Sequence, residues 1–324
     1  MDTINFGILG AGWIADWMAR TIVHMPEVAP YAVASRDAAK AGAFAKQHGF
    51  AKSYGSYREM AEDPDLHLVY VATPNSHHYE HAKLCLENGK HVLLEKAFTA
   101  TAPQAEELIA LAREKKLLLT EAIWTRYMPF SQTISRLVAD GAVGGVTALY
   151  ANLGYNVRKN ERIHSPALAG GALLDLSVYT LNFAFMILGT DHDSVDATCR
   201  KYPSGVDSHN SITLGYPDGK LAVLYATTLS ATDRRGVIYG DKGYLVVDNI
   251  NNPDTAQLFS PKWELQETFA CPPKITGYEY QVQSAVAAIR DGRLECPEMP
   301  HAETIRIMRL FDSIRAEWGI VFDC

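Results

Sequence analysis

The first 120 or so residues alternate short apolar runs with amphipathic stretches, and this alternation constrains the fold more than any other feature of the sequence. The apolar runs read INFGIL, YAVAS, LHLVYVA, HVLLE and KLLLT, and helical patterns over residues 13–25, 37–48, 76–88 and 101–115 separate them. Strands that are apolar on both faces and joined through helices form a parallel sheet covered on both sides. We therefore predict a doubly wound α/β domain over residues 1–122.

A different pattern begins at about residue 123. A predicted helix over 130–140, which Gly141 ends, leads into the strand-like run VTALYANLGY and then a second helix that follows two glycines. The next strand-like runs have only turns between them: SVDATCRKY, SITLGY, LAVLYATTL, GVIYG, YLVVDN and AQLFS. Two helices, over 278–290 and 301–317, close the chain. The sequence thus predicts a second α/β domain over 123–324, built on a mostly antiparallel sheet.

Composition and charge argue against several classes of protein. A net charge of −7 without a basic cluster argues against nucleic-acid binding. We find no apolar run of the roughly 18 residues that span a bilayer, and the chain starts on a strand-like segment rather than a leader. The cysteines form no CxxC pair, which argues against a zinc site or a disulfide framework and indicates a reducing cytoplasm: Cys85, Cys199, Cys271, Cys296 and Cys324. We expect a soluble cytoplasmic protein.

The turn between the first strand and the first helix carries a dinucleotide-binding pattern. The segment GAGWIA places Gly10, Gly12 and Ala15 at the three positions of GxGxx(G/A). Gly10 permits the tight turn, Gly12 lets a pyrophosphate approach the backbone, and Ala15 lets the helix pack closely. The amides of Trp13 and Ile14, at the start of the helix, would hold the phosphates. Glycines at a helix entry also occur as plain turn residues, but in this series of strands and helices we predict dinucleotide binding.

The end of the second strand favours NADP over NAD. An acid at this point would bind the adenosine ribose, whereas this chain has Ser35 followed by Arg36. A hydroxyl beside a guanidinium suits a 2′-phosphate, because the guanidinium fork matches phosphate oxygens. Asp37 is the competing candidate and would favour NAD, but we expect it to cap the next helix.

Polar residues follow the fourth and fifth strands, where the carboxyl ends of a parallel sheet line a ligand crevice. We expect these to surround the ribose and the nicotinamide: Thr73, Asn75, His78, Glu95 and Lys96. Lys96 is also a catalytic candidate, and its alternative is a surface ion pair with Glu95. His77 and His81 have the spacing of a metal pair on a helix, but no third ligand is in view, so we expect no metal.

The segment GGALLDLSVYTLN places Asp175 and Tyr179 four residues apart on a predicted helix. At that spacing two side chains lie one above the other on the same face. Such a pair suits proton transfer. In the alternative, Asp175 caps local backbone groups and Tyr179 belongs to the core.

Several aromatic and basic residues are candidates for substrate contact. An aromatic ring offers a flat apolar surface to a ligand, and we expect Trp124 and Tyr155 to lie beside the substrate, with packing in the core as the alternative. Polar groups of the substrate would face Arg158 and Asn156. Lower-ranked candidates, for which packing or ion pairs are the alternative, are Tyr127, Arg126 and Arg162.

Six segments stand in the same order as in the Gfo/Idh/MocA oxidoreductases: GILGAGWIA, ATPNSHHYEHA, LEKAFT, EAIWTRYMP, GGALLDLSVY and HAETIRIMRLFDSIRAEWG. The resemblance covers almost the whole chain. Within the family the chain most resembles the branch of the dimeric dihydrodiol dehydrogenase and the NADP-dependent D-xylose dehydrogenase.

The resemblance implies a Rossmann domain followed by an α/β domain whose large open antiparallel sheet commonly forms a homodimer interface. The family's Glu-Lys motif falls on Glu95 and Lys96, its Asp-x-x-x-Tyr/His motif on Asp175 and Tyr179, and the branch's substrate-side aromatic on Trp124. The chain departs from the pattern at two positions. Ala97 replaces the usual proline of Glu-Lys-Pro, and Ser177 replaces a common glycine, which narrows the space beside the helix.

Together these features predict an NADP-preferring dehydrogenase, with NAD as the alternative cofactor, that acts on a secondary alcohol of a sugar or cyclic diol. A free phenol titrates at about pH 10, so Tyr179 needs a positive neighbour to work near neutrality, and Lys96 can supply that charge. Asp175 would orient the lysine or the substrate hydroxyl. The alternatives are a reductase of a C=N or C=C bond on the same fold and a non-catalytic dinucleotide-binding sensor.

Overall fold

The computed structural model describes residues 3–322, so Cys324 lies outside the described residues. The chain forms two compact units. Of the described residues, the first unit contains 3–124 together with Lys274–Arg309, and the second contains Thr125–Pro273 and 310–322. This division departs from the predicted one, because residues 274–309 belong with the N-terminal unit. Hydrogen bonds explain the association: the amide of Leu119 donates to the Leu294 carbonyl, and His301 Nε2 lies 2.7 Å from the Leu119 carbonyl oxygen.

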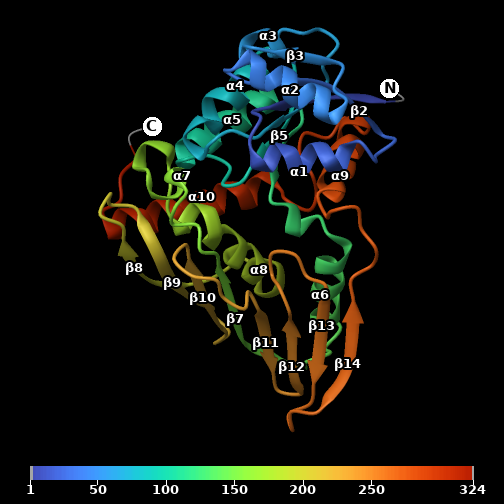
Figure 1. Ribbon diagram of the computed structural model, residues 1–324. Helices are drawn as coiled ribbons and strands as arrows, with labels where there is room; N and C mark the ends of the chain where they lie inside the picture. Colours follow the sequence, from blue (N-terminus) through green and yellow to red (C-terminus); the bar gives the residue numbers. More distant parts are fainter. Residues whose placement is uncertain (1–2, 323–324) are drawn as a thin grey trace. The chain divides into compact units, whose positions relative to one another are not determined.

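The first unit is built on a six-stranded sheet in the order β3-β2-β1-β4-β5-β6 (Figure 1). All five pairings are parallel, which confirms the predicted doubly wound sheet. The strands are β1 (Ile4–Leu9), β2 (Val28–Ala34), β3 (Lys52–Tyr54), β4 (Leu68–Val71), β5 (His91–Glu95) and β6 (Leu119–Ala122). The sequence did not predict β3, because its polar, mostly exposed residues at the sheet edge carry no apolar pattern.

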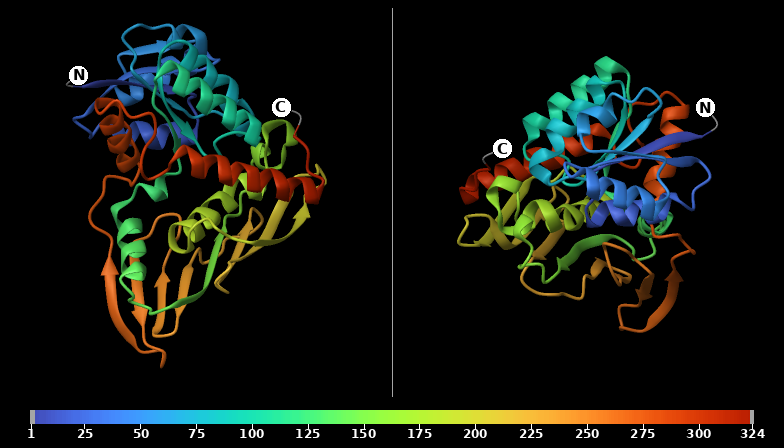
Figure 2. Two further views of the ribbon diagram at one scale, coloured as in Figure 1. Left: turned by 180° about the vertical axis from the view of Figure 1, so that it is seen from behind. Right: turned by 45° about the horizontal axis from the view of Figure 1, so that its top comes forward.

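Helices cover both faces of this sheet, as Figure 2 shows. They are α1 (Trp13–Ile22), α2 (Ala38–His48), α3 (Tyr57–Ala61), η1 (Asn75–His77), α4 (His78–Glu87), α5 (Ala102–Lys115), α9 (Glu279–Arg290) and the first part of α10 (His301–Trp318). The carboxylate of Asp37 accepts a hydrogen bond of 3.1 Å from the Lys40 amide and so caps α2 as predicted. Helix α9 packs against β5, which covers the sheet on that side.

The second unit is built on an eight-stranded sheet in the order β14-β13-β12-β11-β7-β10-β9-β8. Only β7 and β10 pair in parallel, so the sheet is mostly antiparallel, as predicted. The strands are β7 (Val146–Gly154), β8 (Ser194–Lys201), β9 (Asp207–Gly215), β10 (Leu221–Thr227), β11 (Gly236–Gly240), β12 (Gly243–Val247), β13 (Thr255–Phe259) and β14 (Leu265–Ala270). Strand β14 was not predicted, because it is a largely exposed edge strand with polar residues.

The helices of this unit are η2 (Trp124–Arg126, at the unit boundary), α6 (Pro129–Ala139), α7 (Glu161–His164), η3 (Pro166–Leu168), η4 (Leu173–Ser177), α8 (Val178–Leu188) and the last part of α10. Both η4 and α8 contact β7 and β10, and α6 contacts α8.

The helical stretch Pro166–Leu188 corrects one sequence expectation. It is long and apolar enough to cross a membrane, with a mean hydropathy of 1.6, although no such run was predicted. Of its 18-residue window, 83% is buried inside the protein. A helix that is apolar on all sides and packs on a sheet is typical of a protein core.

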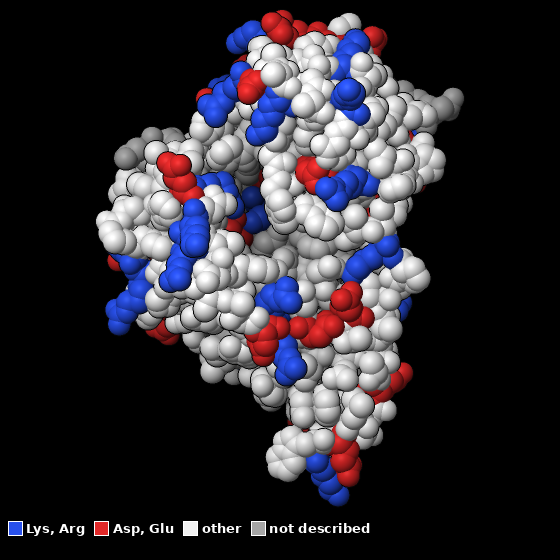
Figure 3. Space-filling model, viewed as in Figure 1, with Lys and Arg blue, Asp and Glu red and all other residues white. Residues whose placement is uncertain are grey.

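Charged side chains of both signs are interspersed on the surface that Figure 3 shows. The net charge of the chain is −7, because acidic residues outnumber basic ones. This arrangement contrasts with the single-sign basic field of proteins that bind a phosphate backbone.

Candidate active site

The turn between β1 and α1 has the geometry of a phosphate-binding loop. Gly10 has φ +109°, and a Cβ built on it would lie 2.7 Å from the Ala72 carbonyl oxygen, so only glycine fits. A Cβ built on Gly12 would meet no described atom within 4 Å, so the backbone is open to a ligand at this position. Ala15 is buried where α1 packs on the sheet. The α1 N-terminus follows Gly12, which has no side chain to cap it, and Trp13 is 73% exposed beside Ile14.

The segment after β2 brings Arg36 together with aromatic groups. The Ser35 hydroxyl accepts a hydrogen bond of 3.2 Å from the Asp37 amide, while its own hydrogen remains available to donate. Burial raises the pKa of the Tyr57 hydroxyl, and the Arg36 guanidinium beside it acts in the opposite direction. The ring of Tyr57 meets that of His81 edge-on at 4.6 Å. Sequence analysis missed Tyr57 together with the short helix α3 that begins at this residue.

His81 lies in the same group of side chains. Its Nδ1 is 3.0 Å from the Thr73 hydroxyl, and its ring stacks on His77 at 5.7 Å. Burial lowers the pKa of His81 to about 4, and the positive charges of Arg36 and the neighbouring histidines act in the same direction. Among the described residues, no three side chains of the metal-binding types gather into a ligand set.

His78 connects the two loops at the carboxyl ends of β4 and β5. Its side chain is fully buried, with Nε2 2.8 Å from the Thr73 carbonyl oxygen and Nδ1 2.8 Å from the Ala97 carbonyl oxygen. The nearby Asn75 is also buried. Both ring nitrogens of His78 therefore contact backbone, and this side chain braces the loops that carry Thr73 and Lys96.

Glu95 and Lys96 follow directly from β5. The Glu95 carboxylate accepts hydrogen bonds from the Tyr70 hydroxyl and, at 3.1 Å, from the Lys96 amide. Glu95 is buried, Lys96 is half-buried, and the Lys96–Ala97 peptide bond is cis. The carboxylate thus holds the backbone from which the Lys96 side chain extends.

Trp124 lies against a residue that sequence analysis missed. Its indole stacks on the Tyr278 ring with centroids 4.4 Å apart and planes inclined by 13°. Both side chains are less than 10% exposed. The only sequence signal was an aromatic residue at the start of a predicted helix, more than 150 positions from Trp124.

Asp175 and Tyr179 lie on two kinds of helix. The sequence predicts one α-helix, whereas Leu173–Ser177 form a π-helical turn, η4, and α8 begins at Val178. An inserted π turn changes the angular relation of residues four apart, and apolar periodicity does not reveal it. Such turns occur frequently at functional sites. Both side chains are about nine-tenths buried.

Arg162 pairs with Asp175, which fits the alternative considered for this arginine. Its Nη1 and Nη2 each lie 3.2 Å from Asp175 Oδ1. Arg126 is buried and donates from Nε to Asn182 Oδ1 at 2.6 Å, which ties it to α8. These contacts give both arginines structural partners within the second unit.

Tyr155 and Arg158 lie in the segment that follows β7. The Tyr155 hydroxyl accepts a hydrogen bond of 3.0 Å from Asn251, and the Arg234 guanidinium lies 5.7 Å from the ring centroid. Arg158 is exposed.

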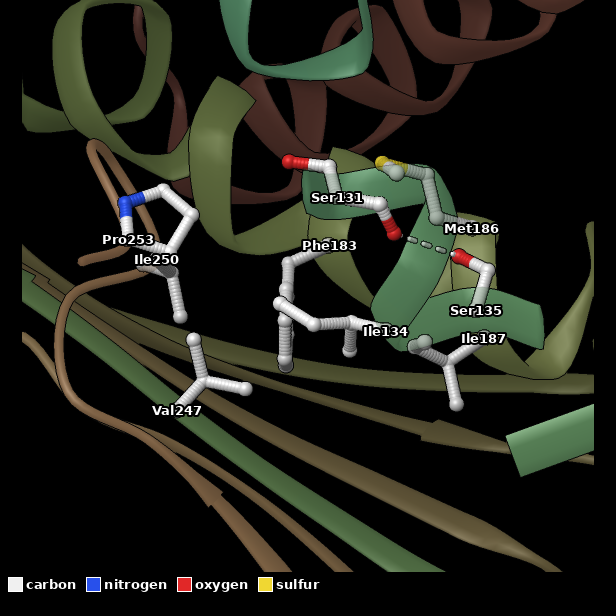
Figure 4. Close-up of a pocket in the computed structure, with 9 residues that line it drawn as sticks. All are labelled: Ser131, Ile134, Ser135, Phe183, Met186, Ile187, Val247, Ile250 and Pro253. Carbon is white, nitrogen blue, oxygen red and sulfur yellow. Dashed lines mark hydrogen bonds between the residues drawn. The ribbon is translucent and has the colours of Figure 1, made fainter. Parts of the chain in front are cut away.

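A small hollow lies elsewhere in the second unit, between α6, α8 and the sheet (Figure 4). Its lining is mostly apolar, as for Ile134, Phe183 and Ile250, and its polar groups are the hydroxyls of Ser131 and Ser135. None of the predicted site residues lines it, and it holds no titratable side chain. This hollow therefore offers no group for proton transfer.

Comparison with known proteins gives matches along nearly the whole chain. Residues 4–123 match the model "Oxidoreductase family, NAD-binding Rossmann fold", and residues 131–246 match the GFO/IDH/MocA C-terminal domain. A D-xylose 1-dehydrogenase (NADP(+)) of Hypocrea jecorina is 34% identical over 99% of this chain and 93% of its own length. A trans-1,2-dihydrobenzene-1,2-diol dehydrogenase of Xenopus tropicalis is 31% identical over 98% of this chain and 99% of its own.

Solved structures share the complete architecture. A 3-ketoreductase from Actinomadura kijaniata, in complex with NADP and TDP-benzene, superposes with a TM-score of 0.89 at 26% identity over 97% of both chains. A levoglucosan dehydrogenase superposes with a TM-score of 0.88 at 18% identity, over 98% of this chain and 97% of its own, which shows the shared fold. Two family models match most of the chain, and relatives above 30% identity align with nearly all of it, so the chain belongs to the Gfo/Idh/MocA family of oxidoreductases, in the branch of the D-xylose and dihydrodiol dehydrogenases.

Proposed function

We propose that this protein is an NADP-preferring dehydrogenase that oxidises a secondary alcohol of a sugar or cyclic diol, or reduces the corresponding carbonyl. The observation that carries the proposal is the open, glycine-shaped turn at Gly10 and Gly12 in a member of an oxidoreductase family. The relatives named for D-xylose and dihydrobenzenediol support the substrate class.

The residues around the turn fit a nicotinamide dinucleotide. Gly12 leaves space at the backbone, and the first amides of α1, at Trp13 and Ile14, would hold a pyrophosphate. Thr73, Asn75 and the Glu95–Lys96 segment would hold the ribose and the nicotinamide, with His78 bracing both loops. When bound, the cofactor accepts or returns a hydride.

We assign the NADP preference to Arg36 and its surroundings. An exposed guanidinium after β2 can bind a 2′-phosphate through two hydrogen bonds, and the Ser35 hydroxyl has a hydrogen to donate. Tyr57 and His81 support this side of the site, since their rings pack together beside Arg36. Neutral His81 adds no charge at neutral pH, so Arg36 is the main source of selectivity.

We propose that Tyr179 transfers the proton and that Lys96 favours its phenolate form. A phenol with a reference pKa of about 10 needs a nearby positive charge to act as a base near neutrality. Asp175, held by Arg162, would orient the substrate hydroxyl or the lysine. Trp124, whose indole is held on one side by its stack on Tyr278, would offer the other face to the C–H face of the substrate.

We further propose a cytoplasmic homodimer that associates through the sheet of the second unit. Exposed large apolar side chains lie on three neighbouring strands, β10, β7 and β11: Leu221, Val223, Tyr150 and Tyr239. Tyr150 pairs with Val223 in the register, so these residues form a continuous patch of the kind that marks interfaces. The described cysteines are free thiols, which suits a reducing compartment. Light scattering of Val223→Glu should show a monomer; an unchanged mass for this variant, or a monomeric wild type, would contradict the interface.

The proposed activity is tested by a spectrophotometric screen. Production of reduced nicotinamide is followed with NADP and with NAD against aldoses, inositols and cyclic diols. We expect turnover with at least one of these substrates and a higher kcat/KM with NADP. The reverse direction is followed as consumption of NADPH or NADH with imines and enones. Turnover only with these substrates would replace the proposal with a C=N or C=C reductase, and cofactor binding without any turnover would indicate a sensor.

A further inference from the structure

A buried carboxylate lies beneath the start of the helix that carries Asp175 and Tyr179. Asp207 is the first residue of β9 and is 2% exposed. Its Oδ2 accepts hydrogen bonds of 2.8 Å from the Leu173 amide and 2.8 Å from Asn210 Nδ2. Leu173 is the first residue of the π-helical turn η4. Asp207 therefore binds an N-terminal amide of this helix, where the helix dipole favours a negative charge.

Asn210 extends this contact to the other end of η4. Its Oδ1 accepts a hydrogen bond of 2.8 Å from the Ser177 hydroxyl, and Ser177 is the last residue of the π turn. Both side chains are buried. The chain of Asp207, Asn210 and Ser177 thus holds η4 at its first and last residues, with Asp175 at its centre. Ser177, which stands where the family commonly has glycine, contributes its hydroxyl to this chain of hydrogen bonds.

The two glycines before η4 are shaped to the same arrangement. A Cβ built on Gly171 would lie 2.3 Å from Asp207 Oδ1, and its φ of +113° favours glycine. A Cβ built on Gly170 would lie 2.5 Å from the Arg162 carbonyl oxygen. Arg162 is the partner of Asp175. The absence of side chains at Gly170 and Gly171 therefore leaves room for the Asp207 carboxylate, which holds η4, and for the segment of Arg162, which holds Asp175.

The buried position of Asp207 disfavours the ionised form of its carboxylate. Burial raises its pKa to about 6, against hydrogen bonds from Asn210 and from backbone amides that lower it. The neighbouring strand β8 contributes the Cys199 thiol, whose pKa Asp207 helps to raise, and Lys201, which pairs with Asp207 in the register but donates to the Trp318 carbonyl. On the helix side, the charges are those of the Arg162–Asp175 pair. A buried carboxylate with a perturbed pKa beside a proposed site is a functional candidate.

We propose that Asp207 is a positioning residue whose ionised carboxylate, with Asn210 and Ser177, fixes the π-helical turn that aims Asp175 and Tyr179 at the substrate. The inference rests on the proposed function of Asp175 and Tyr179. Asp207 acts through the helix backbone.

The first test compares the pH dependence of kcat in wild type, Asp207→Asn and Asp196→Asn. Asp196 is an exposed aspartate on β8 and serves as the matched control. In wild type, kcat should fall as the pH drops through about 6, because protonation removes the charge that holds η4. Asp207→Asn should lower kcat about tenfold at pH 8, lose this acid limb and keep its KM for NADP, since misplacement of reacting groups costs rate rather than cofactor binding. An Asp207→Asn profile that coincides with those of wild type and the control would overturn the proposal.

A second test does not depend on turnover. Hydrogen exchange of the peptide covering 170–182 should be faster in Asp207→Asn and in the milder Ser177→Ala, with unchanged exchange in α5 as the internal control. Ser177→Ala removes a single hydroxyl and keeps the proposal testable if Asp207→Asn does not fold. Unchanged exchange in Ser177→Ala and in any folded Asp207→Asn would overturn the inference even if the enzyme proves to be a dehydrogenase. A wild type that turns over no substrate would instead refute the proposed function, while the exchange result would still decide whether this network holds η4.

Discussion

The raised pKa of Asp207 makes a quantitative prediction about stability. A group whose folded-state pKa exceeds its unfolded value binds its proton more tightly in the folded protein. Its contribution to the free energy of unfolding is therefore fully present below the unfolded pKa and is lost as the pH rises through the folded pKa. For Asp207 this window runs from the reference value of 3.8 to about 6. Asp207→Asn cannot titrate and should lack this pH dependence.

The magnitude follows from the distance between the two pKa values. A difference of about two pH units, at about 1.4 kcal/mol for each, gives ~3 kcal/mol over the whole window. Between pH 5 and pH 7.5, where the protein is easier to study, the integral gives about 1 kcal/mol. Wild type should lose this amount of unfolding free energy relative to Asp207→Asn on going from pH 5 to pH 7.5. The constant difference between the two proteins, which reflects altered hydrogen bonds, cancels in the comparison.

The assay is urea unfolding of wild type, Asp207→Asn and Asp196→Asn at both pH values. Other titrating groups are shared by the three proteins and cancel in the differences. The Asp196→Asn curves should follow those of wild type, because this side chain is exposed on the surface of β8. If the difference between wild type and Asp207→Asn is the same at pH 5 and pH 7.5, Asp207 is not a buried carboxylate with a raised pKa, and the reasoning is refuted.

Two further substitutions test the proposed site. Arg36→Ala should raise KM for NADP at least tenfold and leave KM for NAD nearly unchanged, because the lost interaction is with the 2′-phosphate alone; equal losses in steady-state kinetics would contradict the assignment. Lys96→Gln should lower kcat and move the limb of the pH profile that reports Tyr179 to higher pH, since the phenolate loses its positive neighbour; a limb at the same pH would show that Lys96 does not tune the phenol.

The parallel sheet was predictable because its strands are apolar on both faces and alternate with helices. The assignment of residues 274–309 to the first unit was not predictable. It depends on contacts between residues far apart in the sequence, such as His301 and Leu119. Strand β14 escaped prediction because an exposed edge strand needs no apolar face.

The candidate site could likewise be predicted from the sequence only in part. The role of Gly10 and Gly12 was predictable because both lie in a short segment between a predicted strand and a predicted helix. The π turn and the role of Asp207 were not predictable from local sequence. The segment GVDSHN has the pattern of an ordinary turn and strand start, and only the fold brings its aspartate to the Leu173 amide. Tyr278 became a candidate only through its stacking on Trp124.

The central claim is that Tyr179 transfers the proton that accompanies hydride transfer. Rapid mixing of saturating NADP and substrate with wild type or Tyr179→Phe measures the rate of hydride transfer in a single turnover, and a titration measures the affinity for NADP. We expect that the affinity is unchanged and that the rate falls by at least the ~10² typical of general acid–base catalysis. A variant that transfers hydride as fast as wild type would contradict it.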